Sequence, residues 1–223
     1  MSDLLPIFPL PNVVLFPNVF LPLHIFELRY REMVADALAS DRIIGMALLR
    51  PGWQHEYEKR PPVYPVGCSG VITHAEPLPD GRYNIVLRGV ERFRILHEDD
   101  AKSYRRALVE PVPEGAGSGD DLAAVRRQRS KLESLIAPTI ERSLGGAGRL
   151  EPIESGGRDS KIPPTMADED LVNALAQYLD LEPLEKQALL EQHSLRTRAE
   201  SLVELLEMKI LIARTPGLSN VAH

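Results

Sequence analysis

Closely spaced prolines alternate with large apolar side chains over the first part of the chain. Five prolines precede residue 25, namely Pro6, Pro9, Pro11, Pro17 and Pro22, and most residues between them are Leu, Ile, Val or Phe. Proline fixes the backbone φ and has no N–H to donate, so this segment cannot be helical and pairs only at the edges, ends or bulges of a sheet. Because the apolar side chains must still be buried, we expect short strands over residues 4–8 and 12–16.

The chain has 223 residues, enough for one sizeable core or two modest ones. Its formal net charge of −6 opposes general binding to phosphate backbones and anionic membranes. Only 5% of the residues are aromatic, which disfavours a stacking surface for single-stranded nucleic acid. Cys68 is the only cysteine, so no intramolecular disulfide can form, and no signal peptide or membrane span is evident. We therefore expect a cytoplasmic protein that does not bind membranes.

Hydrophobic patterning predicts several strands and one helix in the first half of the chain. Residues 26–39 carry apolar side chains at helical spacing, whereas 43–49, 66–75, 82–96 and 104–112 have the character of strands. The pair Asp80-Gly81 favours a hairpin between two of these strands, because it tolerates positive φ. Since no β-α-β alternation is present, we expect an α+β protein with a twisted, partly closed, barrel-like sheet.

The second half of the chain is predicted to be helical. A flexible linker at 113–119 comes first, and helices are indicated from Asp120 onward and at 168–180, 183–193 and 195–213. Pro138 should kink or end the first of these helices, and residues 143–165 are predicted to form a mobile loop. We thus expect two domains, a β-rich one over 1–114 and a helical one over 115–223.

Several motifs along the chain resemble one known family. They are Pro-Leu-Pro-Asn-Val-Val-Leu-Phe-Pro at 9–17, Leu-Pro-Leu-His-Ile-Phe-Glu at 21–27, and the segments 65–68, 78–83, 89–94 and 184–191. Their order and spacing are similar to those of the N-terminal, substrate-recognising domain of Lon-type ATP-dependent proteases, and above all to bacterial proteins made of that domain alone. The resemblance implies a PUA-like pseudo-barrel with one helix, followed by a helical bundle. It also implies substrate recognition without the ATPase and protease domains. Asn18 stands where the family more often has glycine, and Leu28 where it often has proline.

The sequence offers no recognisable catalytic site. A P-loop needs Gly-Lys followed by Ser or Thr, and the glycines at 115–119 and 145–148 are not followed in this way. The six histidines show no His-x-x-x-His spacing, and a single cysteine supplies no zinc-binding cluster. A Ser-Lys protease pair is harder to exclude, since its members need not be close in sequence. We expect a non-catalytic protein with no cofactor and no metal.

Four residues are candidates for contact with a partner. Trp53 and Tyr57 lie in the predicted loop 51–63, where aromatic side chains can anchor a partner, although Trp53 could instead cover the end of the barrel. Arg88 and Arg92 share sequence parity with Arg82 and Arg94, so an unbroken strand would place all four on one face. Such a strip could bind an acidic segment or RNA, or could be an ordinary solvated face. A bulge at Gly89 would flip the parity.

The preferred interpretation is a module that binds unfolded or peptide-like protein segments, by adding a strand to an exposed sheet edge. Two alternatives stay open at this point. One is an RNA-binding module that uses the arginine-lined sheet face, and the other is an enzyme with an unrecognised site between the domains. A protease or a chaperone is a candidate partner, self-association is open, and the net charge disfavours nucleic acid and membranes.

Overall fold

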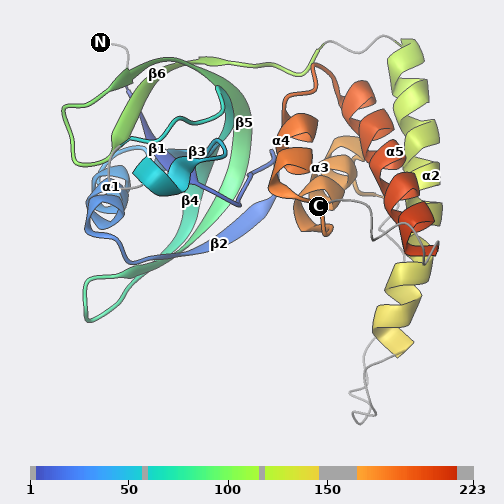
Figure 1. Ribbon diagram of the computed structural model, residues 1–223, viewed down its shortest axis with the longest axis horizontal. Coiled ribbons are helices and arrows are strands. Elements are labelled where there is room, and N and C mark those ends of the chain that lie inside the picture. Colours follow the sequence, from blue (N-terminus) through green and yellow to red (C-terminus); the bar gives the residue numbers. More distant parts are fainter. Residues whose placement is uncertain (1–3, 57–59, 116–118, 146–164, 215–223) are drawn as a thin grey trace. The chain divides into compact units, whose positions relative to one another are not determined.

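Six strands form one mixed sheet that closes on itself (Figure 1). The computed structural model describes residues 4–56, 60–115, 119–145 and 165–214. The strands are β1 (Leu5–Leu10), β2 (Phe20–Ile25), β3 (Ile43–Leu48), β4 (Val66–Pro77), β5 (Tyr83–Asp99) and β6 (Arg105–Pro111). Their order is β2-β5-β4-β3-β1-β6, and an additional pairing joins β6 to β5. Strands β5, β4, β3, β1 and β6 therefore make a closed barrel, and β2 is added to it along β5 alone.

The helices are α1 (Leu28–Leu38), the 3₁₀ turn η1 (Trp53–Glu56), α2 (Gly119–Gly145), α3 (Asp168–Tyr178), α4 (Pro183–Leu190) and α5 (Leu195–Arg214). The expectation of an α+β fold is confirmed by these elements and by the mixed sheet. The chain divides into two compact units, one made of residues 1–115 and 173–193, the other of 116–172 and 194–223. The sequence placed the whole of 115–223 in one helical domain, whereas the structure groups α4 and the end of α3 with the sheet.

The prolines of β1 lie where the strand lacks one of its two neighbours. β1 pairs in parallel with β3 from Ile7 onward and antiparallel with β6 only as far as Ile7. Pro6 therefore precedes the ladder with β3, and Pro9 follows the ladder with β6. A missing N–H is tolerated at such positions, because no partner strand is present to accept its hydrogen bond. This is how a proline-rich strand fits inside the barrel.

The strand expected at residues 12–16 is not formed, and β2 at 20–25 was not predicted from the sequence. Val14, Leu15 and Phe16 are nevertheless buried, as their apolar character requires. The backbone N–H of Phe16 donates to Oε1 of Gln177 at 3.2 Å instead of to a neighbouring strand. A side chain from α3 thus satisfies a buried donor in a segment that prolines keep out of the sheet.

The long hairpin between β4 and β5 forms at the predicted position. Gly81 has a φ of +80°, a conformation that glycine adopts without steric cost. The N–H of Gly81 donates to the carbonyl of Leu78 at 2.8 Å, which closes the turn.

The predicted helix at 26–39 is also confirmed as α1, whose buried face consists of Tyr30, Met33, Val34 and Ala37.

The helices of the second half begin close to the predicted positions. Pro183 is the first residue of α4, where its missing N–H is harmless, and Glu182 and Glu185 form a reciprocal capping box there. Pro138 does not end α2, which continues to Gly145. The predicted loop at 143–165 lies mostly outside the described residues. Within the described ranges, none of the helices is both long and apolar enough to cross a bilayer.

β5 carries a bulge that decides which side chains face the barrel. Cys68 pairs with Arg92 and Gly70 pairs with Gly89, so Val90 and Glu91 of β5 lie opposite the single residue Ser69 of β4. The Oγ of Ser69 donates to the carbonyl of Glu91 at 3.1 Å and holds the extra residue in place. One extra residue reverses the alternation of side chains along the strand. Residues on the two sides of the bulge therefore follow opposite parity.

We predict that Gly89→Ala destabilises the fold, because a Cβ at this position would lie 2.0 Å from the carbonyl oxygen of Phe16. Overpacking against backbone costs about 1–3 kcal/mol. Urea unfolding measures the effect, and Gly119→Ala is the control, since nothing lies within 4 Å of a Cβ at the start of α2. Equal stability of the two variants would show that the approach of Phe16 to β5 is not tight.

Candidate functional site

A groove with a volume of about 970 Å³ opens beside the start of β1, and we call it the β1 groove. Its described lining comes from the first residues of β1, the end of α1, the bulge of β5, and the segment that leads into and through β6. All of these elements belong to the first compact unit. Small-molecule sites have volumes of about 300–1,000 Å³, so the groove has room for a short stretch of extended polypeptide.

One side of the groove is continuous with the barrel core. Phe93 is 2% exposed and clusters with Ile7, Ala47 and Ala107, while Leu5 and Val109 are partly buried against this cluster. Val90 stands on the bulge with 46% of its surface exposed. Because Leu5, Val90, Phe93 and Val109 all line the groove, a ligand there would meet an apolar surface that the core holds rigid.

The opposite side is fixed by a polar contact between α1 and the segment before β6. The carboxylate of Asp36 accepts a 2.5 Å hydrogen bond from Nζ of Lys102 and a 2.7 Å bond from the hydroxyl of Tyr104. The hydrogen bond from Lys102, then that from Tyr104, holds the pKa of Asp36 below its ordinary value. Asp36 in turn raises the pKa of Lys102, and burial raises that of Tyr104. The three groups therefore form a charge-assisted network that anchors α1 at the groove.

The charged groups of the groove are not balanced. Lys102 is paired with Asp36, and Arg106 is paired with Asp99 at 2.5 Å. Glu91 and Asp41 also line the groove, and within the described residues neither has a Lys, Arg or His nitrogen within 4.0 Å. Asp41 accepts a hydrogen bond from the backbone N–H of Ile43 at 3.1 Å, but the negative charge of neither carboxylate is balanced by a cation among the described residues.

The described lining contains no histidine and no cysteine. In the part of the chain that the structure describes, no group of three or more His, Cys, Asp or Glu side chains is placed to hold a metal ion. Besides apolar side chains and carboxylates, the described lining holds the hydroxyls of Ser40, Ser69 and Tyr104, so it offers apolar contact and hydrogen bonding.

The aromatic candidates lie away from this groove or outside the described residues. Trp53 begins η1, is half-buried, and is not among the residues that line the β1 groove. Its loop is tied down by hydrogen bonds from Arg50 to the carbonyls of Pro62 and Val63. Tyr57 falls in 57–59, outside the described residues.

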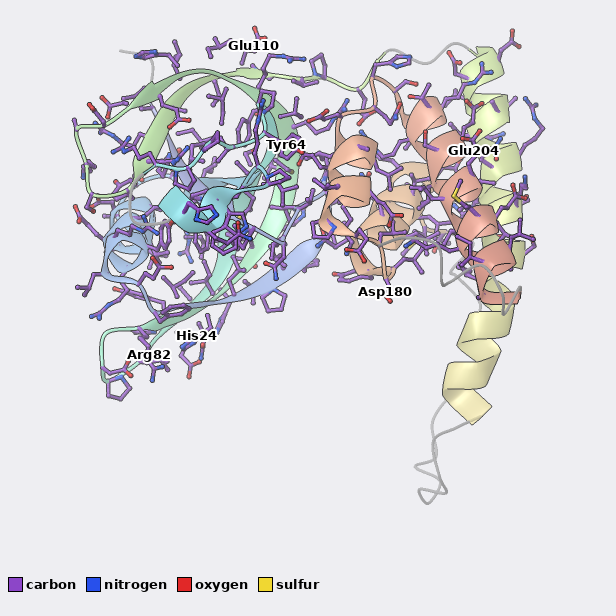
Figure 2. All side chains as sticks on the ribbon, in the orientation of Figure 1. His24, Tyr64, Arg82, Glu110, Asp180 and Glu204 are labelled. Carbon is purple, nitrogen blue, oxygen red and sulfur yellow. The ribbon has the colours of Figure 1, made fainter. Side chains whose placement is uncertain are left out.

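Arg82, which precedes β5, and the three β5 arginines at 88, 92 and 94 do not form one strip, because the bulge separates them. Arg82 pairs with Asp80 at 2.5 Å, and Arg94 pairs with Glu110 at 3.6 Å. Arg82 also lies 3.3 Å from Nε2 of His24 at the end of the hairpin (Figure 2). Arg88 is exposed, with Nη2 donating to Asn18 at 3.3 Å. The unbroken-strand assumption behind the basic strip was wrong, because the bulge at Val90 and Glu91 keeps the four arginines from sharing one face.

Arg92 is 2% exposed and is a structural residue. Its guanidinium donates to the carbonyls of Leu190 at 2.9 Å, of Gln192, and of Pro113 at 3.3 Å, and it pairs with Glu114 at 3.2 Å. Leu190 is the last residue of α4, and the carbonyls of a last helical turn have no partner within the helix. The Arg92 guanidinium therefore supplies a hydrogen-bond donor and a positive charge at the helix end. A partner from outside cannot reach this side chain, which rules out a direct contact at Arg92.

Comparison with known proteins gives a consistent result over nearly the whole chain. A family model described as the ATP-dependent protease La (LON) substrate-binding domain matches residues 4–208. Lon protease 2 of Syntrophobacter fumaroxidans is 26% identical over 206 residues, covering 90% of this chain and 24% of its own length. Lon protease 2 of Myxococcus xanthus is 27% identical, covering 93% of this chain and 24% of its own. The chain thus spans about a quarter of the length of these relatives.

Two solved structures share the fold. The N-terminal domain of Mycobacterium avium complex Lon protease matches with a TM-score of 0.63 and 17% identity, over 92% of this chain and 98% of that one. A Lon N-terminal domain protein from Xanthomonas campestris matches with a TM-score of 0.53 and 21% identity, over 96% of this chain and 99% of that one. At these identities the likeness concerns the arrangement of the backbone.

We predict that Arg92→Met lowers the free energy of unfolding by about 3–5 kcal/mol, because it leaves a carboxylate and helix-end carbonyls without their cation. The control is Arg88→Met on the same strand, which removes an exposed guanidinium and should change stability by about 0.5 kcal/mol or less. Urea unfolding of both variants checks the prediction. A reversed order would mean that Arg92 is accessible and Arg88 structural.

We predict that Asp36→Asn changes the pH dependence of stability. The pKa of Asp36 is lowered in the folded state, so its contribution is present above the ordinary pKa of about 3.9 and is lost as pH falls through the folded value. The stability difference between wild type and variant should therefore be large at neutral pH and shrink below about pH 4. Thermal unfolding across this range measures it. A difference independent of pH would contradict the charged network.

Proposed function

Because the chain belongs to the family of the ATP-dependent protease La (LON) substrate-binding domain, as its N-terminal motifs predicted, we propose that it binds unfolded or peptide-like segments of other proteins and catalyses no reaction on them. The family match over residues 4–208 is the observation that carries this proposal. The match covers 24% of the length of each of the two relatives, and the rest of each relative is not aligned with this chain. The β1 groove is the proposed binding site.

The character of the groove supports this proposal. An unfolded segment exposes apolar side chains together with backbone amides, and the groove offers an apolar wall beside polar groups. The wall is backed by the closed barrel, so it is preorganised and loses little entropy on binding. The proposed setting is the cytoplasm, which agrees with a single, buried cysteine.

Strand addition, the mechanism expected from the sequence, has one place in the sheet that suits it. β2 pairs with β5 only, and no other described strand pairs with it. However, Pro22 interrupts the donors of β2, and the hydroxyl of Tyr178 already donates to the carbonyl of Phe20 at 2.9 Å. Proline on an edge strand is a usual barrier to further pairing. Side-chain contacts in the β1 groove are therefore the preferred mechanism.

The alternative functions have less support in the described residues. RNA binding rested on the arginine strip, which the bulge of β5 breaks, and the net charge of −6 opposes it further. An enzyme would need a group poised for acid-base or nucleophilic work. In the groove, the pKa of Asp36 is lowered toward the ionised form, and its carboxylate is held by hydrogen bonds from Lys102 and Tyr104. It behaves as a structural anion.

We predict that Val90→Asn weakens binding of a permanently unfolded, fluorescently labelled polypeptide about tenfold, since it removes an apolar contact worth about 1.4 kcal/mol or more. Fluorescence anisotropy measures the dissociation constant. The control is Leu96→Asn on the same strand, because Leu96 is 53% exposed, close to the 46% of Val90, and does not line the groove. If both variants bind with the dissociation constant of wild type, the binding site lies outside the β1 groove. If wild type does not bind the polypeptide at all, the proposed function is wrong.

A further inference from the structure

The β1 groove presents uncompensated negative charge next to its apolar wall. Its described lining holds the carboxylates of Asp36, Asp41 and Glu91 and the cations of Lys102 and Arg106. Both cations already have carboxylate partners at 2.5 Å. The charge of Asp36 is balanced by its ion pair with Lys102, whereas Asp41 and Glu91 have no cationic partner among the described residues. The groove therefore has a charge that a ligand can complement.

Glu91 is placed at the junction of the two kinds of surface. It lies on the bulge of β5 immediately after Val90, and both residues line the groove. The bulge is held by its backbone, through the hydrogen bond from Ser69, so the carboxylate of Glu91 takes no part in fixing it. An exposed carboxylate beside an exposed apolar side chain suits a long cationic side chain, whose stem packs on the apolar surface while its head reaches the charge.

We propose that the β1 groove selects segments in which an arginine or lysine stands within a short apolar run, with Glu91 as the main determinant of this preference. The inference rests on the proposed function, since it names the class of segment that the same groove takes. Arginine should be preferred to lysine, because its planar guanidinium donates two parallel hydrogen bonds to a carboxylate. Segments that carry Glu or Asp at that position are disfavoured by repulsion from Glu91 and Asp41.

The test uses labelled peptides that share one apolar sequence and differ at a single central position, which is Arg, Gln or Glu. Wild type should bind the Arg peptide about fivefold more tightly than the Gln peptide, and the Glu peptide least, as measured by anisotropy. Added salt should reduce this ratio, because the carboxylates are solvent-exposed. Glu91→Gln should flatten the order, and Glu91→Lys should reverse it.

A matched control separates the local carboxylate from the net charge of the chain. Glu204→Lys changes the formal charge by the same amount at an exposed position of α5 that is not among the residues lining the groove. It should leave the order of the three peptides unchanged. If Glu204→Lys shifts the order as much as Glu91→Lys, the preference reflects overall charge and the inference is overturned. Equal binding of all three peptides to wild type overturns it while the proposed function stands, whereas no binding of any peptide or of an unfolded polypeptide refutes the proposed function.

Discussion

The bulge in β5 is the constraint on which the rest of the first unit depends. β5 is long enough to pair with β4, β2 and β6, and it must curve to meet all three partners. One extra residue opposite Ser69 provides the bend and reverses the alternation of side chains along β5 as far as the second irregularity at Ile95 and His97. Because of the same extra residue, the Arg92 side chain points toward α4, and Val90 and Glu91 lie at the groove. Barrel closure, attachment of α4 and the shape of the proposed site thus share one local cause.

The contacts of Arg92 explain why α4 is in the same compact unit as the sheet, although α4 is far from β5 in the sequence. A buried guanidinium needs several acceptors, and the end of a helix supplies carbonyls that otherwise have none. Gln187 of the same helix adds a 2.9 Å hydrogen bond to the carbonyl of Val66 on β4. These polar contacts join elements from the two ends of the chain within one unit, which a division at residue 114 does not anticipate.

The sequence predicted the α+β class, the β4–β5 hairpin, α1 and the helices of the second half, because each depends on local patterning or turn chemistry. β2 was not predicted, and a strand was wrongly predicted at 12–16. Buried apolar residues between prolines give the same sequence pattern whether their backbone N–H groups donate to a neighbouring strand or to a side chain such as that of Gln177. The groove was missed because its lining comes from distant segments. Gly89, followed by Val90 and Glu91, is the one local signal, because a glycine in a strand favours a bulge, but it does not by itself predict a groove.

Binding of segments of other proteins in the β1 groove is the proposal on which the other functional predictions depend. The most direct measurement is to follow the backbone amide resonances of the isotopically labelled protein while an unlabelled, permanently unfolded polypeptide is added. If the segments bind in the groove, saturable shifts should be concentrated at Leu5, Val90, Glu91 and Val109, with little change around Trp53 or Arg88. Saturable shifts concentrated around Trp53 or along β2, with the groove resonances unmoved, would contradict the proposal.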